Sequence, residues 1–130
     1  MAANTQTTHR FENLSGHQFM SLVTVRKNGT PVPTPVWFAQ AEDRLYVVTQ
    51  ANAGKVKRIS HTPAVTVAPC TSNGTLLGEA KNATARVLPE SEWKMADAHL
   101  SRKYGLMKRM FDLASRVRGA KRVYLELIPA

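Results

Sequence analysis

The chain has 130 residues, of which 43% are apolar and 21% charged, a composition that predicts one globular domain with a single core. Its apolar runs all fall short of the ~18 residues of a membrane-spanning helix. The single cysteine, Cys70, excludes an intramolecular disulfide and a cysteine-based zinc cage. Residues 1–10 are polar and lack the apolar region of a secretory signal, so we expect a cytoplasmic protein in which residues 1–9 are mobile.

The net charge of +9 is distributed unevenly along the chain. Residues 54–130 hold fourteen basic and six acidic side chains, whereas the charges of residues 1–53 nearly balance. Such an excess raises the local concentration of anions. Nucleic acid, an anionic membrane, and a phosphorylated or polyanionic small ligand are therefore the candidate partners.

The first half of the chain predicts a meander of three antiparallel strands after a short helix at Arg10–Phe19. The Asn28-Gly29 dipeptide is typical of a type I′ turn, and Glu42-Asp43 marks the next turn. Runs rich in β-branched and aromatic residues place the three strands at Met20–Arg26, Pro31–Gln40 and Leu45–Thr49.

The second half predicts three helices among three further strands. The strands are expected at Ala64–Pro69, Leu76–Leu88 (with a bulge at Gly78) and Arg122–Ile128, and the helices at Ala53–Ser60, from Pro89 to Tyr104, and at Leu106–Arg118. Gly105 and Gly119 are suitable helix ends, and the apolar residues Leu106, Met110, Leu113 and Val117 share one helix face. Six strands with inserted helices predict a mainly β fold, a small antiparallel barrel or else a sandwich.

The run Pro31–Pro35 alternates proline with other residues, so every second amide along the strand cannot donate a hydrogen bond. One interpretation is an edge strand protected against aggregation. The other is a strand that borders a groove, in which Val36 and Trp37 present a flat apolar surface to a planar ligand.

The segment from Thr49 to Arg58 is the strongest candidate site. A strand ends in a hydroxyl, a loop of small residues follows, and a helix then begins with the cations Lys55, Lys57 and Arg58. Cations at a helix N-terminus oppose the helix dipole unless an anion lies between them. This context favours phosphate binding over a solvated basic face, although no Walker motif is present.

Residues 102–122 carry eight basic side chains and one acid, Asp112. A solvated helix surface and an electrostatic funnel toward an anion are both consistent with this pattern. Aromatic residues do not alternate with these charges as a nucleic-acid stacking platform requires, and we interpret Tyr104 and Phe111 as packing residues.

No side chain stands out as a catalytic acid, base or nucleophile. The four histidines lack metal-ligand spacing, so no metal site is expected, and Cys70 has no evident partner base, which favours a packing role. If the protein is an enzyme, we expect a bound cofactor to carry the chemistry.

Taken in order, these segments resemble the pyridoxamine 5′-phosphate oxidase-like flavin and deazaflavin proteins over about residues 18–128. Residues 21–29 resemble the first hairpin of that family, residues 33–38 the strand that lines the isoalloxazine pocket, and residues 45–58 the phosphate-binding segment. Residues 63–71 and 102–106 resemble the subgroup that uses the deazaflavin coenzyme F420.

The resemblance implies a six-stranded split β-barrel of the FMN-binding type that forms a homodimer, with the cofactor at the subunit interface. Ring contacts are implied for Pro35, Val36 and Trp37, and phosphate contacts for Thr49, Lys55, Lys57 and Arg58. Flavin-using oxidases of this family have Ser and Arg where this chain has Ala53 and Gly54, which favours F420 over FMN.

The expected function is hydride transfer between reduced F420 and a small organic acceptor. An FMN-dependent oxidoreductase of the same fold is the first alternative. A protein without enzymatic activity that binds the cofactor or nucleic acid is the second.

Overall fold

One antiparallel sheet of seven strands forms the body of the computed structural model, which describes residues 11–119 and 121–130. Residues 1–9, which we expect to be mobile, lie outside the described residues. The strand order is β2-β1-β5-β6-β7-β4-β3. The strands are β1 (Phe19–Val25), β2 (Pro31–Trp37), β3 (Ala39–Ala41), β4 (Arg44–Gln50), β5 (Ala64–Cys70), β6 (Lys81–Val87) and β7 (Arg122–Pro129).

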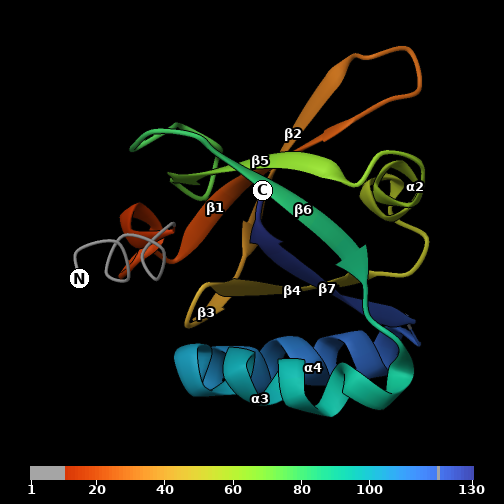
Figure 1. Cartoon of the computed structure of the whole chain (residues 1–130). Coiled ribbons are helices and arrows are strands. Elements are labelled where there is room, and N and C mark those ends of the chain that lie inside the picture. The colour runs from red at the N-terminus through yellow and green to blue at the C-terminus, as the bar shows by residue number, and fades with distance from the viewer. Residues whose placement is uncertain (1–10, 120) are drawn as a thin grey trace.

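One short helix precedes β1, and the other helices lie between β4 and β5 and between β6 and β7. They are the short 3-10 helices η1 (Glu12–Leu14) and η2 (Glu90–Glu92) and the α-helices α2 (Gly54–His61), α3 (Trp93–Tyr104) and α4 (Leu106–Arg118). Figure 1 shows α3 and α4 side by side beneath β4 and β7, with α2 at the opposite end of the curled sheet near β6. Among the described residues, no helix is long and apolar enough to cross a membrane.

The sheet curls into a split barrel because its two edges, β2 and β3, are adjacent in the chain and separated only by Phe38. The backbone N–H of Phe38 donates to the Tyr104 hydroxyl at 2.9 Å, and its carbonyl accepts from the Lys103 ammonium at 2.8 Å. Side chains of α3 thus satisfy the backbone groups that a continuous strand would pair. The expected strand Pro31–Gln40 is therefore split in two, and the sheet has seven strands instead of six.

The expected three-strand meander needs the same correction. The hairpin of β1 and β2 is present, but β4 pairs with β3 and β7 and not with β2. In the first hairpin only Gly29 has a positive φ, of 90°, and Arg26 pairs with Thr30 across a three-residue loop. The turn is therefore not the expected type I′ turn, which needs two positive φ angles.

Two apolar clusters stabilise the fold, one on each face of the sheet. The inner cluster fills the barrel and includes Leu125 and Leu127 of β7, while the outer cluster includes Tyr124 of β7 and packs under α3. This alternation is the one that the sequence predicts for the last strand. Tyr46 of β4 lies in the outer cluster between Leu45 and Val47 of the inner one, so β4 follows the same rule.

Two other expected elements are shorter in the structure. The helix at Arg10–Phe19 is reduced to η1 within the described residues, and β1 begins at Phe19. The strand at Leu76–Leu88 is reduced to β6, and Leu76 makes only an isolated bridge to Cys70. Gly78 is not a bulge within a ladder: a Cβ at this position would lie 2.8 Å from Cγ of Pro69, so a glycine is needed for close approach.

Candidate functional site

The outer ends of β2 and β4, the start of α2 and the middle of α4 enclose a groove with a cavity of about 410 Å³, which we call the β2–β4 groove. Such a volume is typical of small-molecule sites. The lining includes five of the seven residues that the sequence identifies as binding residues: Pro35, Val36, Trp37, Thr49 and Lys55. The structure therefore brings these five residues together, and their contacts with a cofactor stay a prediction.

The prolines of β2 face the free edge of the sheet. Because proline cannot donate to the ladder with β1, the amides that pair with β1 are those of the residues between the prolines. β2 is also the last strand of the sheet, and Pro35 lines the groove. β2 is therefore a sheet edge blocked by prolines that also borders a groove, and the planar ligand stays a prediction.

Trp37 forms an aromatic wall of the groove. Its ring stacks on Tyr104 with centroids 4.5 Å apart and planes 10° apart, and it meets Phe111 at 5.5 Å and 50°. The Tyr104 hydroxyl donates to the carbonyl of Gln18 at 2.6 Å, and burial raises the pKa of this phenol to about 12. α3 and α4 thus hold the tryptophan in a fixed orientation.

Lys55 provides the cationic end of the groove. Its ammonium lies 3.4 Å from the Thr49 hydroxyl, and no carboxylate among the described residues pairs with it. Burial, followed by the nearby charge of Arg58, lowers the pKa of Lys55. No side chain caps the amino end of α2, so the first backbone amides of this helix lie next to a half-buried ammonium in the same segment of the chain.

Lys57 and Arg58, the other two predicted residues, lie outside the groove. They line a second cavity of about 440 Å³, the basic cavity, together with Val25, Arg26, Lys27, Gly54 and His61. Arg58 donates from Nε to the Thr24 hydroxyl at 2.6 Å, which fixes its guanidinium over Gly54. The cavity has four cationic side chains and no acidic one in its described lining, and it begins one residue before Lys55.

The residues of this region that the sequence did not identify include one aromatic residue and two cations. Phe111 lines the groove from α4, although the sequence suggested only a packing role. Arg26 and Lys27 reach the basic cavity from the hairpin between β1 and β2. No local pattern marks these residues, because only the folded sheet brings them to α2.

The basic stretch 102–122 is not one surface. Lys108 is 1% exposed and lies 2.6 Å from Asp97 and 2.7 Å from Asp112, which also pairs with Arg122 at 2.6 Å. The apolar side of α4 faces solvent instead: Leu106, Met107, Met110, Leu113 and Val117 are all exposed. α4 therefore packs on the fold through its buried ion pairs and leaves an apolar face uncovered.

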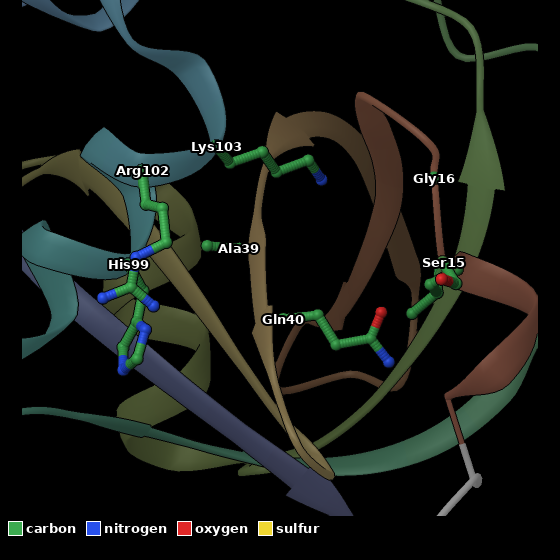
Figure 2. A pocket seen from close by; sticks show the side chains of 8 residues that line it. Ser15, Gly16, Ala39, Gln40, His99, Arg102 and Lys103 are labelled. Atoms are coloured by element: carbon green, nitrogen blue, oxygen red, sulfur yellow. The ribbon is translucent and has the colours of Figure 1, made fainter.

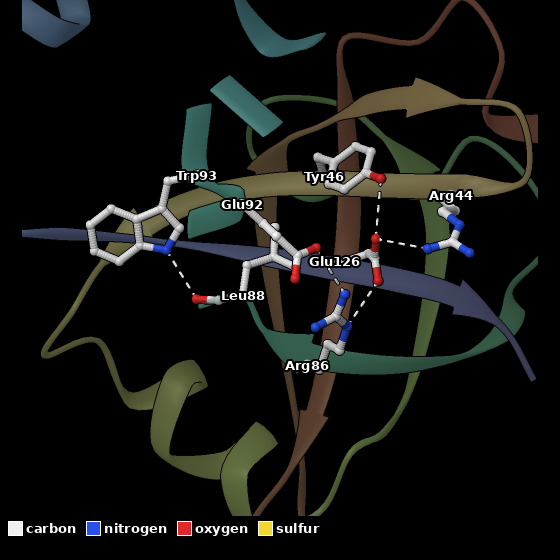
Figure 3. Close-up of polar contacts among 7 residues, drawn as sticks. All are labelled: Arg44, Tyr46, Arg86, Leu88, Glu92, Trp93 and Glu126. Carbon is white, nitrogen blue, oxygen red and sulfur yellow. Dashed lines mark hydrogen bonds and ion pairs between the residues drawn. The ribbon is translucent and has the colours of Figure 1, made fainter. Parts of the chain in front are cut away.

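Glu126 is the most buried carboxylate, and both of its oxygens accept hydrogen bonds (Figure 3). One oxygen accepts from Arg44 and Tyr46 at 3.1 Å each, and the other accepts from Arg86 at 2.9 Å. Burial alone would raise the pKa of this carboxyl, but the hydrogen bonds from Arg86, Arg44 and Tyr46 outweigh burial and lower it. A fully paired carboxylate of this kind is structural.

Two other candidate chemistries find little support. Cys70 is buried, and burial raises the pKa of its thiol, so the packing interpretation fits better than a thiolate nucleophile. Within residues 11–119 and 121–130, no group of three or more His, Cys, Asp or Glu side chains could hold a metal ion.

Comparison with known proteins identifies the family. A model described as "Pyridoxamine 5'-phosphate oxidase" matches residues 7–129. The chain belongs to the pyridoxamine 5′-phosphate oxidase family. No match is found among curated proteins. The family membership confirms the resemblance drawn from the motif order.

Solved structures share the fold of this family member. HutZ, the heme storage protein of Vibrio cholerae, superposes with a TM-score of 0.69 at 16% identity, covering 92% of this chain and 87% of its own. A structure described as F420 reductase gives a TM-score of 0.59 at 19% identity, with coverages of 92% and 91%. An FMN binding protein of Nostoc punctiforme gives 0.55 at 18%, with coverages of 98% and 78%. These likenesses confirm the split barrel.

Proposed function

We propose that the protein is an F420-dependent oxidoreductase that acts as a homodimer and passes hydride from the reduced coenzyme to a small unsaturated or quinone-like acceptor. One observation carries this proposal. The β2–β4 groove has an aromatic wall and ends at the unpaired ammonium of Lys55, and the basic cavity begins one residue away, at Gly54.

The shape and chemistry of the groove suit a planar heteroaromatic ring. Val36, Trp37 and Phe111 supply apolar and aromatic surface, and Pro35 offers a carbonyl but no competing N–H at the edge. Trp37 is already stacked on Tyr104, so no side-chain freedom is lost there when a ligand contacts it. Within this site, Pro35, Val36 and Trp37 take the role of ring contacts.

The charges favour F420 over FMN. FMN brings a single phosphate, which Lys55, Thr49 and the amides of α2 could hold alone. F420 brings a phosphodiester and several tail carboxylates, and the four cations of the basic cavity, Lys57 and Arg58 among them, would remain unpaired without such an anion. Water solvates Arg26, Lys27 and Lys57, which are exposed, and a polyanion would be attracted by all four charges together.

Bound F420 supplies the hydride chemistry, and the chain supplies binding and orientation. No described side chain in the groove is a carboxylate, a histidine or a cysteine. We therefore assign no proton transfer to these residues. The contribution of the chain is to fix the ring against Trp37 and to fix the phosphate at Lys55. Positioning of this kind accounts for a large part of many enzymatic rate enhancements.

The homodimer is supported by the exposed apolar face of α4. The exposed residues of this face include Leu113 and Val117, on the same helix that places Phe111 in the groove wall. Contiguous apolar surface of this kind on a small protein marks an interaction site.

Titration with F420 and with FMN, each at low and at high salt, tests the proposal. F420 is expected to bind more tightly, and salt should narrow the difference because exposed pairs are screened over about 8–10 Å. Tighter binding of FMN at both salt concentrations, or binding of DNA but of neither coenzyme, would contradict it. Oxidation of reduced F420 on addition of a quinone then tests turnover.

Lys55→Ala should weaken F420 binding about ten- to a hundredfold, because one charge-assisted hydrogen bond is lost. Lys94→Ala is the matched control, since Lys94 is an exposed lysine on α3 far from the groove lining. Equal effects of the two substitutions would show that the charge acts only as a long-range field.

A further inference from the structure

A pocket on the far side of Trp37, which we call the α3 pocket, plays no part in the proposed function. It has a volume of about 490 Å³ and lies between α3, β3 and the turn after η1. Figure 2 shows Lys103 extending across the pocket, with Arg102 and His99 beside it on α3 and Gln40 opposite. Leu14 and Ala39, both buried, lie at the base of the pocket.

The pocket is lined by basic side chains without an acidic side chain among its described lining residues. These basic side chains are those of Arg102, Lys103 and His99. Arg102 is exposed and makes no recorded hydrogen bond or ion pair within the part of the chain that the structure describes. Residues 1–10, which precede the pocket in the chain, contain no Asp or Glu in their sequence. They therefore have no side-chain carboxylate with which to neutralise it.

Lys103 is held in place but not neutralised. Its ammonium donates to the carbonyls of His17 at 2.6 Å and Phe38 at 2.8 Å and lies 3.5 Å from the centroid of the Phe38 ring. These partners are neutral, and partial burial lowers the pKa of Lys103 to about 8. Two of its three N–H donors bind carbonyls and the ammonium lies over the Phe38 ring, so Lys103 presents a positioned positive charge to the pocket.

We propose that the α3 pocket binds a small organic anion whose carboxylate or phosphate contacts Arg102 and Lys103. The planar fork of Arg102 suits a two-oxygen acceptor, and Lys103 adds a second, pre-positioned cation. The hydroxyl of Ser15 and the amide of Gln40 border the same space as further polar groups.

The site differs from the proposed cofactor site and can be tested without any coenzyme. The probes are benzoate, inorganic phosphate and, as a neutral analogue, benzyl alcohol, each titrated into the uniformly ¹⁵N-labelled full chain. Benzoate is expected to shift the backbone amides of Ser15, Gly16 and Gln40, and phosphate to shift the same amides more weakly. Benzyl alcohol should leave them unchanged.

Arg102→Gln should weaken benzoate binding about tenfold, because a charge-assisted hydrogen bond is lost. Lys94→Gln removes the same charge from an exposed position on the same helix and should change the affinity less than twofold. The proposal is overturned if the two variants behave alike, if benzyl alcohol binds as well as benzoate, or if the anions shift only the amides of the β2–β4 groove.

Discussion

Lys108 is predicted to be the cation on which the stability of the α3–α4 pair depends most. Its side chain is 1% exposed and pairs with Asp97 and Asp112, so Lys108→Met keeps the apolar stem but leaves two carboxylates without this partner. Removal of one member of a buried ion pair typically costs about 3–5 kcal/mol.

Two features of the structure reduce the expected loss in the free energy of unfolding. Asp97 keeps a hydrogen bond from Tyr124 at 2.7 Å, and Asp112 keeps Arg122 at 2.6 Å. The two carboxylates are also 37% and 27% exposed, so water replaces part of what is lost. We therefore expect a loss of about 2–3 kcal/mol in the free energy of unfolding. For a chain of this size such a loss lowers Tm by roughly 8–12 °C.

Urea unfolding followed by circular dichroism, at one fixed protein concentration, measures this loss. Lys94→Met is the matched control because it removes an exposed lysine of α3, and it should change stability by less than about 0.5 kcal/mol. If Lys108→Met is no less stable than Lys94→Met, the buried network does not stabilise the helix pair. A double-mutant cycle with Asp112→Asn should show a coupling of at least about 0.5 kcal/mol.

Three further predictions concern acid, alkali and assembly. Glu126→Gln should lower the free energy of unfolding at neutral pH. It should also reduce the loss of stability below about pH 4.5, because the pKa of Glu126 is lowered in the folded state and protonation removes the stabilisation that its carboxylate gives. Urea unfolding of the variant and the wild type from pH 3 to 7 measures both effects. Between about pH 8 and 10 the wild type should gain stability relative to Lys103→Met, because the pKa of Lys103 is lower in the folded than in the unfolded state and its ammonium loses the proton first in the folded state. A difference in the free energy of unfolding that does not change with pH would contradict the burial of its ammonium. Light scattering should show a dimer of 14.4 kDa chains, which Leu113→Glu converts to monomer if the apolar face of α4 is the interface.

The sequence predicts those parts of the fold that depend on local pattern. The alternation of Tyr124, Leu125 and Glu126 identifies both faces of β7, and Gly105 and Gly119, with φ of 53° and 69°, end the two long helices as expected. The groove residues of β2 and β4 were also predictable, because strand ends and a following helix define where a ligand can approach.

Features that depend on contacts distant in the chain were not predictable. The break at Phe38 follows from hydrogen bonds with Lys103 and Tyr104, about 65 residues away. Lys108 looks like a surface cation in the sequence, and only the packing of α4 on α3 shows that it is buried. The apolar face of α4 has the spacing of a core helix but stays exposed in a single chain, since Lys108 and not that face turns inward.

Trp37 fluorescence offers the most direct test of the claim that the coenzyme ring lies in the β2–β4 groove. Trp93 is the only other tryptophan, so in Trp93→Phe all tryptophan emission comes from residue 37. F420 should quench that emission, and the dissociation constant from quenching should equal the one from an independent titration. Lys55→Ala should raise both dissociation constants by the same factor. Binding of F420 that leaves Trp37 emission unchanged would place the ring elsewhere, and the absence of F420 binding would contradict the proposed function itself.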